Sequence, residues 1–112
     1  MNLPAFLTNL PSIDVPFPED IVRTSAIQSE QGLMVIFEIL QDFELPPHSH
    51  LGQWGTVIAG EVELTIGDET KTYTPGMSYN IPAGVVHSGK LKAGAKAIDI
   101  FEEPDRYALT KS

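Results

Sequence analysis

The amino-acid sequence predicts an all-β protein that folds as a closed barrel or a double-sheet jelly roll. Short apolar runs rich in β-branched and aromatic residues follow one another along the chain, with turn residues between them. Residues 61–66 alternate strictly between polar and apolar side chains, as a half-exposed strand does. No stretch has a convincing helical pattern. Many short strands in one small domain shelter their edges best by closing on themselves or by forming two packed sheets.

Residues 1–20 are predicted to form an extended N-terminal arm. Four prolines interrupt this segment, and seven large apolar residues make it too apolar for a free tail. We therefore expect the arm to cover a surface, either of its own barrel or of a neighbouring subunit. The segment lacks the basic start and the continuous apolar run of a signal peptide, so the cytoplasm is the expected compartment.

The barrel is expected over residues 21–104, followed by a polar tail over residues 105–112. Residues 33–40 are apolar on nearly both faces, which indicates a strand buried on both sides; an amphipathic helix is the alternative that the β-branched content disfavours. Residues 43–47 are expected to turn the chain. The predicted strands span residues 21–27, 33–40, 54–59, 61–66, 70–74, 77–81, 85–87 and 95–101.

Composition narrows the classes of function. At 112 residues the chain forms one domain with a modest core. Its net charge of −8 is spread along the sequence, which disfavours nucleic-acid and anionic-membrane partners because phosphate groups would be repelled. The chain has no cysteine, so disulfides, thiolate metal ligands and cysteine nucleophiles are excluded. A small-molecule ligand is the expected partner.

The three histidines form the strongest candidate site. His48 and His50 are two residues apart, so in a strand both imidazoles project to the same side. Gln53 follows a glycine that permits a tight reversal, and its amide would converge on the same point. A single histidine in a strand is more often structural than a ligand, and two at this spacing beside a turn strengthen the case for a metal site without deciding it.

The same residues carry a resemblance to a known family. His48-x-His50-x-x-Gln53, followed by six residues and Gly60, resembles the first motif of the cupin family. A second run resembles the second cupin motif: Gly76, five residues, Pro82-x-Gly84, two residues and His87. The two motifs together cover about residues 46–89.

The resemblance implies a single-domain, cupin-type double-stranded β-helix (a jelly-roll barrel) with one divalent transition metal inside. The implied ligands are His48, His50, Gln53 and His87, and the metal could be manganese, iron, cobalt, nickel, copper or zinc. The family typically has a glutamate at a slightly longer spacing where this chain has Gln53. With neutral ligands only, the metal charge would stay uncompensated and the centre would favour an anionic ligand. Alternatively, Gln53 turns away and leaves a three-histidine face.

Several other residues are weaker candidates. Strand alternation places Trp54 on the face opposite to Gln53, where packing is its expected role. Asp99 lies in an apolar run, and an unpaired carboxylate there is costly, so it would support a histidine or pair with Arg106 or Lys96. Further residues could line a pocket but are ordinary core residues; they are Met34, Phe37, Phe43, Met77 and Tyr79.

Two classes of function follow from this reading. The first is a small metalloenzyme, such as an oxygenase or an isomerase that acts on a small anionic or enolic metabolite. The second is a non-catalytic module that binds or senses a small molecule, since the same fold hosts both. A third possibility is a purely structural, metal-free barrel, but in that case the three histidines would stand in the two motifs by chance. The apolar arm and the two-sided strand at 33–40 also predict a homodimer, packed wall to wall with the arms across the partner.

Overall fold

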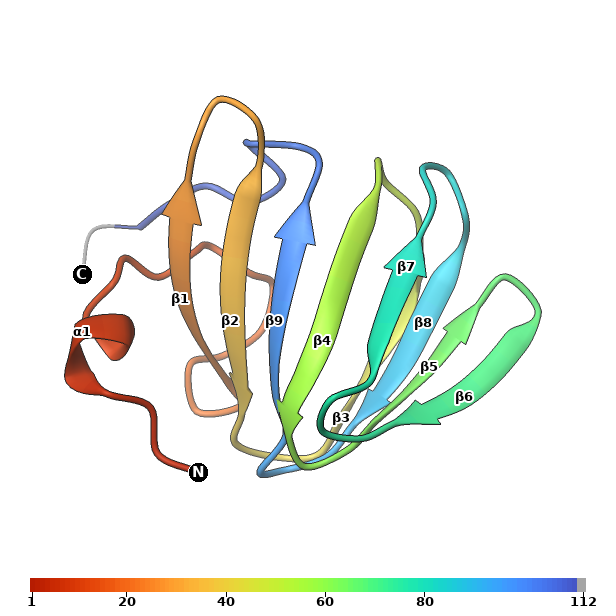
Figure 1. Cartoon of the computed structure of the whole chain (residues 1–112), viewed down its shortest axis with the longest axis horizontal. Coiled ribbons are helices and arrows are strands. Elements are labelled where there is room, and N and C mark those ends of the chain that lie inside the picture. The colour runs from red at the N-terminus through yellow and green to blue at the C-terminus, as the bar shows by residue number, and fades with distance from the viewer. Residues whose placement is uncertain (111–112) are drawn as a thin grey trace.

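The computed structural model describes residues 1–110 and contains nine strands and one single-turn helix in that part of the chain (Figure 1). Their bounds are α1 (Ala5–Thr8), β1 (Val22–Gln28), β2 (Leu33–Ile39), β3 (Phe43–His48), β4 (Gln53–Ala59), β5 (Val62–Ile66), β6 (Glu69–Tyr73), β7 (Ser78–Ile81), β8 (His87–Leu91) and β9 (Lys96–Phe101). Within residues 1–110 no helix is long and apolar enough to cross a membrane.

The strands form two antiparallel sheets that lie against each other (Figure 1). The five-stranded sheet has the order β1-β2-β9-β4-β7, and the four-stranded sheet has the order β3-β8-β5-β6. Strands distant in sequence are neighbours in both sheets, because β9 inserts between β2 and β4 and β8 lies between β3 and β5. The predicted all-β jelly roll is confirmed, in its double-sheet form.

The core lies between the sheets and follows from strand alternation. In β2 the side chains of Leu33, Val35 and Ile39 point inward and are at most 5% exposed. The outer side chains of the same strand, Ile36 and Glu38, are also buried. The prediction that this segment is buried on both faces is therefore confirmed.

The main difference from the sequence prediction concerns residues 43–47. They were expected to form a turn, because Pro46 and Pro47 cannot donate to a sheet ladder. The structure places them in β3, an edge strand that pairs only with β8 and has an irregular register between Leu45 and His48. An edge strand with a bulge is where a sheet tolerates proline. Likewise, His87 begins strand β8 rather than ending a strand.

The arm folds back on its own chain over residues 11–17. Ile13 is buried and forms a β-bridge with Leu109, and Phe17 packs on the main core cluster. The carbonyl of Pro11 accepts a hydrogen bond from the backbone N–H of Ala26 in β1. Residues 105–110, predicted as part of a polar tail, thus run beside the arm on the β1 side of the molecule (Figure 1), while residues 111–112 of that tail lie outside the described residues.

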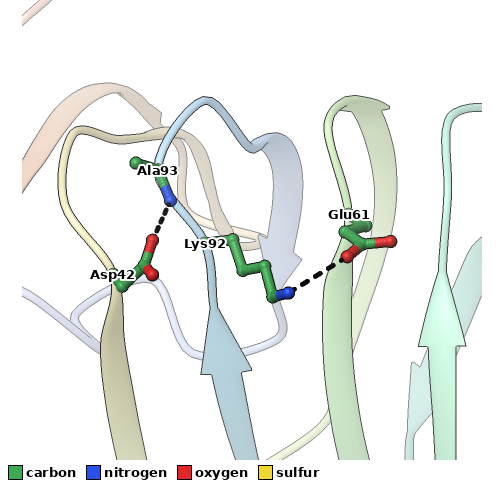
Figure 2. Close-up of polar contacts among 4 residues, drawn as sticks. All are labelled: Asp42, Glu61, Lys92 and Ala93. Atoms are coloured by element: carbon green, nitrogen blue, oxygen red, sulfur yellow. Dashed lines mark hydrogen bonds and ion pairs between the residues drawn. The ribbon is translucent and has the colours of Figure 1, made fainter.

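Three turns are tied together at one end of the sheets (Figure 2). The carboxylate of Asp42 accepts a hydrogen bond of 2.8 Å from the backbone N–H of Ala93. Lys92 forms an ion pair of 3.5 Å with Glu61, but both side chains are well exposed, so the pair contributes at most about 1 kcal/mol. These contacts lie at the start of β3 and the end of β8, which leaves the opposite ends of both strands for the histidines.

Candidate metal centre

The three histidines come together at one end of the four-stranded sheet. His48, the last residue of β3, pairs directly with His87, the first residue of β8. His50 follows two residues after His48. One ligand nitrogen from each of the three rings lies within 4.8 Å of the others. The ring centroids are 4.1 Å apart for His48 and His87 and 4.7 Å apart for His50 and His87. The structure thus assembles a cluster that could hold a metal ion.

Backbone carbonyls select the tautomer of each ring. Nδ1 of His48 lies 2.9 Å from the carbonyl oxygen of Pro46, Nδ1 of His50 lies 2.6 Å from that of Leu51, and Nδ1 of His87 lies 3.0 Å from that of Val85. A carbonyl oxygen only accepts, so each Nδ1 carries the proton. Each neutral ring then keeps a lone pair on Nε2, as metal-ligating histidines do when their other nitrogen is held by a carbonyl.

The free nitrogens fit a divalent metal. Nε2 of His50 and Nε2 of His87 are both buried, and neither has a hydrogen-bond partner among residues 1–110. An unsatisfied buried polar atom costs about 1–3 kcal/mol. Burial lowers the pKa of both rings from its ordinary value of 6.5, so they stay neutral and able to ligate at neutral pH. Two orphaned acceptors beside a third imidazole form a donor set that a transition metal satisfies.

Gln53 lines the same cavity as the histidines but contacts a carboxylate. It is the first residue of β4, and its Nε2 donates a hydrogen bond of 2.9 Å to Oδ1 of Asp99. The hydroxyl of Tyr79 donates a second hydrogen bond of 2.7 Å to the same oxygen. Burial raises the pKa of Asp99 to about 6, and the two donated hydrogen bonds oppose that rise, so Asp99 is ionised at neutral pH.

The partners expected for Asp99 were wrong. Lys96 is three residues away in the same strand, so it faces the outer side of the sheet while Asp99 faces inward. The guanidinium of Arg106 stacks over the ring of Tyr107 instead, 4.6 Å from its centroid. Asp99 lines the same cavity but makes no direct hydrogen bond to a histidine; its side-chain hydrogen bonds come from Gln53 and Tyr79.

The cavity beside the histidines is small and mostly apolar, with a volume of about 90 Å³. Of the five residues predicted as possible pocket-lining residues, Phe37, Phe43 and Tyr79 line this cavity. Met34 and Met77 do not. Trp54 is on the outer face, opposite to Gln53, and is 43% exposed. Other lining side chains include Val15, Phe17, Leu45, Leu64, Leu91, Phe101 and Tyr107.

Sequence reasoning missed two features of this site. Tyr107 lies in the segment predicted as a polar tail, yet it lines the cavity and its ring packs 5.6 Å from that of Phe101. Gly55 was not singled out, although it stands directly opposite Asp99 on β4. The apolar pair Tyr107 and Leu109 was a signal that the tail is packed. The register that sets Gly55 against Asp99 cannot be read from the sequence.

Fold and site together define a small two-sheet β protein with a histidine cluster in its interior. The sequence profile of the cupin domain matches residues 34–101, which is more than half of the chain. The chain therefore belongs to the cupin family. No curated protein sequence matches it.

Solved structures share the fold. KdgF from a Halomonas species has a TM-score of 0.71 at 21% identity, over 84% of this chain and 86% of that chain. An RmlC-like cupin from Shewanella frigidimarina has a TM-score of 0.72 at 22% identity, over 86% of both chains. An oxalate decarboxylase from Bacillus subtilis has a TM-score of 0.70 at 20% identity, over 88% of this chain but 28% of that chain. Similarity at these identities shows the fold alone.

Proposed function

We propose that this cupin is a metalloenzyme, an oxygenase or isomerase that acts on a small anionic or enolic metabolite. The observation that carries the proposal is the pair of buried, unpartnered Nε2 atoms of His50 and His87 beside His48 at an apolar cavity. The structurally similar oxalate decarboxylase, whose Mn(II) centres are known, supports a metal at such a site.

The polar residues of the site would hold the metal, and the apolar residues form the walls of the cavity. His48, His50 and His87 would hold the ion, with Gln53 as a fourth candidate ligand. When bound, a divalent transition metal supplies Lewis-acid or redox chemistry toward an oxygen-bearing substrate. The apolar walls exclude water and lower the local dielectric, which strengthens the attraction between the centre and an anionic group.

A non-catalytic binding or sensing role is the second candidate, and one observation favours it. Besides the histidines, the titratable side chains lining the cavity are Asp99, Tyr79 and Tyr107. Asp99 and Tyr79 are already bonded to each other, and burial raises the pKa of both tyrosines. Apart from the histidines, the cavity-lining group of the described chain with a pKa near neutrality is Asp99, and its Oδ1 is already engaged by Gln53 and Tyr79.

The first prediction tests metal binding and separates the two roles. The double variant His48→Ala, His50→Ala should lose bound metal, measured by elemental analysis of purified protein, and keep its far-ultraviolet circular dichroism. Retention of metal at the wild-type stoichiometry would overturn the proposed site. Wild-type protein loaded with each candidate metal is then screened for oxygen uptake and isomerisation with small organic acids and enols. Saturable ligand binding without turnover would favour the sensing role.

We also propose that the protein is a homodimer that associates through the outer face of the five-stranded sheet. A row of apolar side chains crosses four adjacent strands there: Ile27, Met34, Ile100 and Trp54. Three of them are exposed by 43–52%. An exposed row of this kind across a sheet is typical of an interface.

Charge complementarity indicates a second copy as the occupant of this face. Arg23 and Lys96 lie at one end of its strands with Glu38 paired between them, so this end has a net charge of +1, while Glu30 and Glu102 follow the strands at the other end. A two-fold axis along the apolar row sets the basic end of one copy against the acidic end of the other. Residues 11–17 of the arm pack on their own chain. We therefore propose association through this sheet face and not through arms that lie across the partner.

A further inference from the structure

We infer that Asp99 is a positioning residue for the metal centre. Through its hydrogen bond with Gln53, the carboxylate of Asp99 provides the metal with negative charge that a carboxylate ligand would otherwise provide directly. The inference rests on the proposed metal site at His48, His50 and His87. It changes the expectation, drawn from the residues of the motif alone, that the metal charge is uncompensated by the protein.

The hydrogen bond to Asp99 sets which end of the Gln53 amide is free. A carboxylate only accepts, so the NH2 group of Gln53 is the end turned to Asp99, at 2.9 Å. The amide oxygen is then the end available to the histidine-lined cavity that Gln53 shares. An N–H donated to a carboxylate also polarises the amide and makes its oxygen a better metal ligand.

The chain reserves space for this arrangement at Gly55. Gly55 stands directly opposite Asp99 across β4 and β9, between the inward positions of Gln53 and Val57. A Cβ atom at Gly55 would lie 2.2 Å from Oδ1 of Asp99 and 2.5 Å from the hydroxyl oxygen of Tyr79. The Gly55 backbone does not have a positive φ, so a side chain is absent here because of space and not because of conformation.

The carboxylate of Asp99 lacks a positive partner within the protein. It is 4% exposed, and among residues 1–110 no lysine or arginine nitrogen lies within 4 Å of it. Two donated hydrogen bonds stabilise the charge but do not neutralise it, and an uncompensated buried charge is costly. A divalent ion held by the histidines would supply the positive charge that Asp99 lacks.

The experiment first removes the negative charge from position 99 and then places it at position 53. Both donors bond the same oxygen of Asp99, so Asp99→Asn can keep both hydrogen bonds and remove only the charge. Co²⁺ affinity of the purified full chain is measured by calorimetric titration, and the visible spectrum of bound Co²⁺ reports the ligand field. Asp99→Asn should weaken Co²⁺ binding about tenfold or more. The double variant Gln53→Glu, Asp99→Asn, which places the carboxylate at position 53, should restore the affinity.

Three further variants test the route and the specificity. In a Gln53→Ala background, Asp99→Asn should change Co²⁺ affinity less than about twofold, because the relay is gone. Glu38→Gln is the matched control: it removes one buried carboxylate from the outer face of the same sheet and should leave the affinity within about twofold of wild type. Gly55→Ala, which displaces Asp99 without removing any polar group, should weaken binding and shift the Co²⁺ spectrum.

Distinct results overturn the inference and the proposed function. Wild-type affinity and an unchanged spectrum in Asp99→Asn would show that Asp99 is merely structural, whatever happens to the melting temperature. An equal loss in the Gln53→Ala background, or no rescue by the charge exchange, would show that Asp99 does not act through Gln53. If wild-type protein itself binds no Co²⁺, the proposed metal function fails.

Discussion

At the scale of single residues, the interior of this protein holds groups whose ionisation is set by burial. Asp99 is a carboxylate whose pKa is raised to about 6 from 3.8, chiefly by burial. His50 and His87 have pKa values lowered by the same cause. The carboxyl group and the two histidines change the free energy of unfolding in opposite directions as the pH rises. A raised acid pKa means that the folded protein binds a proton more tightly than the unfolded chain, and a lowered histidine pKa means the reverse.

The second prediction concerns the pH dependence of stability in metal-free protein. Asp99 contributes stability below about pH 4, and this contribution is lost as the pH rises through about 6; its full size is about 3 kcal/mol. Relative to Asp99→Asn, wild-type protein should therefore become less stable as the pH is raised across this window. Urea denaturation of both proteins in the presence of a chelator measures the difference, in which the histidine contributions cancel. Parallel pH profiles would contradict the raised pKa.

At the scale of strands and turns, two glycines with a positive φ have different roles. Gly60 has a φ of +68°, and a Cβ atom there would lie 2.7 Å from Cα of Ala95 in the turn before β9. Gly67 has a similar φ of +62°, but a Cβ atom there meets only a side-chain carbon of Val85, at 3.9 Å. The two positions share the same backbone requirement, and only Gly60 also needs the space.

The third prediction compares these two glycines. Gly67→Ala should cost about 1–2 kcal/mol, the penalty of a left-handed conformation. Gly60→Ala should cost more, by a further 1–3 kcal/mol on the order of an overpacked contact, because the backbone of Ala95 has to move. Urea denaturation of both variants at one pH gives the two free energies of unfolding. An equal loss would show that the turn before β9 adapts freely.

The elements also show what the sequence could and could not predict. Alternation and turn residues placed most strands within one or two residues of their observed bounds, because these signals are local. Strand β3 was missed because proline weakens a strand in general but is tolerated at an edge, and edge position depends on the whole sheet. The histidine cluster followed from short-range spacing. The contacts of Asp99 with Gln53 and Tyr79 depend on the register of three strands, which no local pattern encodes.

At the scale of the whole molecule, the outer face of the five-stranded sheet is the surface through which we predict that two copies associate. Its apolar row carries no charge, while the protein as a whole has a net charge of −8. Association through this face buries the apolar row without bringing the acidic edges of two copies together, because the basic end meets the acidic end.

The fourth prediction is that the protein sediments as a dimer at tens of micromolar concentration. Ile100→Glu places a charge in the centre of the apolar row and should convert it to a monomer, with the fold retained by circular dichroism. Phe6→Glu is the control, since Phe6 is 74% exposed on the arm and lies outside the row. A monodisperse wild-type monomer, or dissociation caused by Phe6→Glu instead, would reject this interface.

The central position of β9 has a consequence for the order of folding events. This strand follows all the others in the chain, yet it occupies the middle of its sheet, between β2 and β4. Hairpins such as β1–β2 and β5–β6 can form early from neighbouring segments, whereas the five-stranded sheet stays in two halves until β9 inserts. Topologies with such distant pairings fold on a timescale of milliseconds to seconds. The histidine cluster draws on β3 and β8, which pair without β9, whereas the wall that carries Asp99 exists only once β9 has inserted.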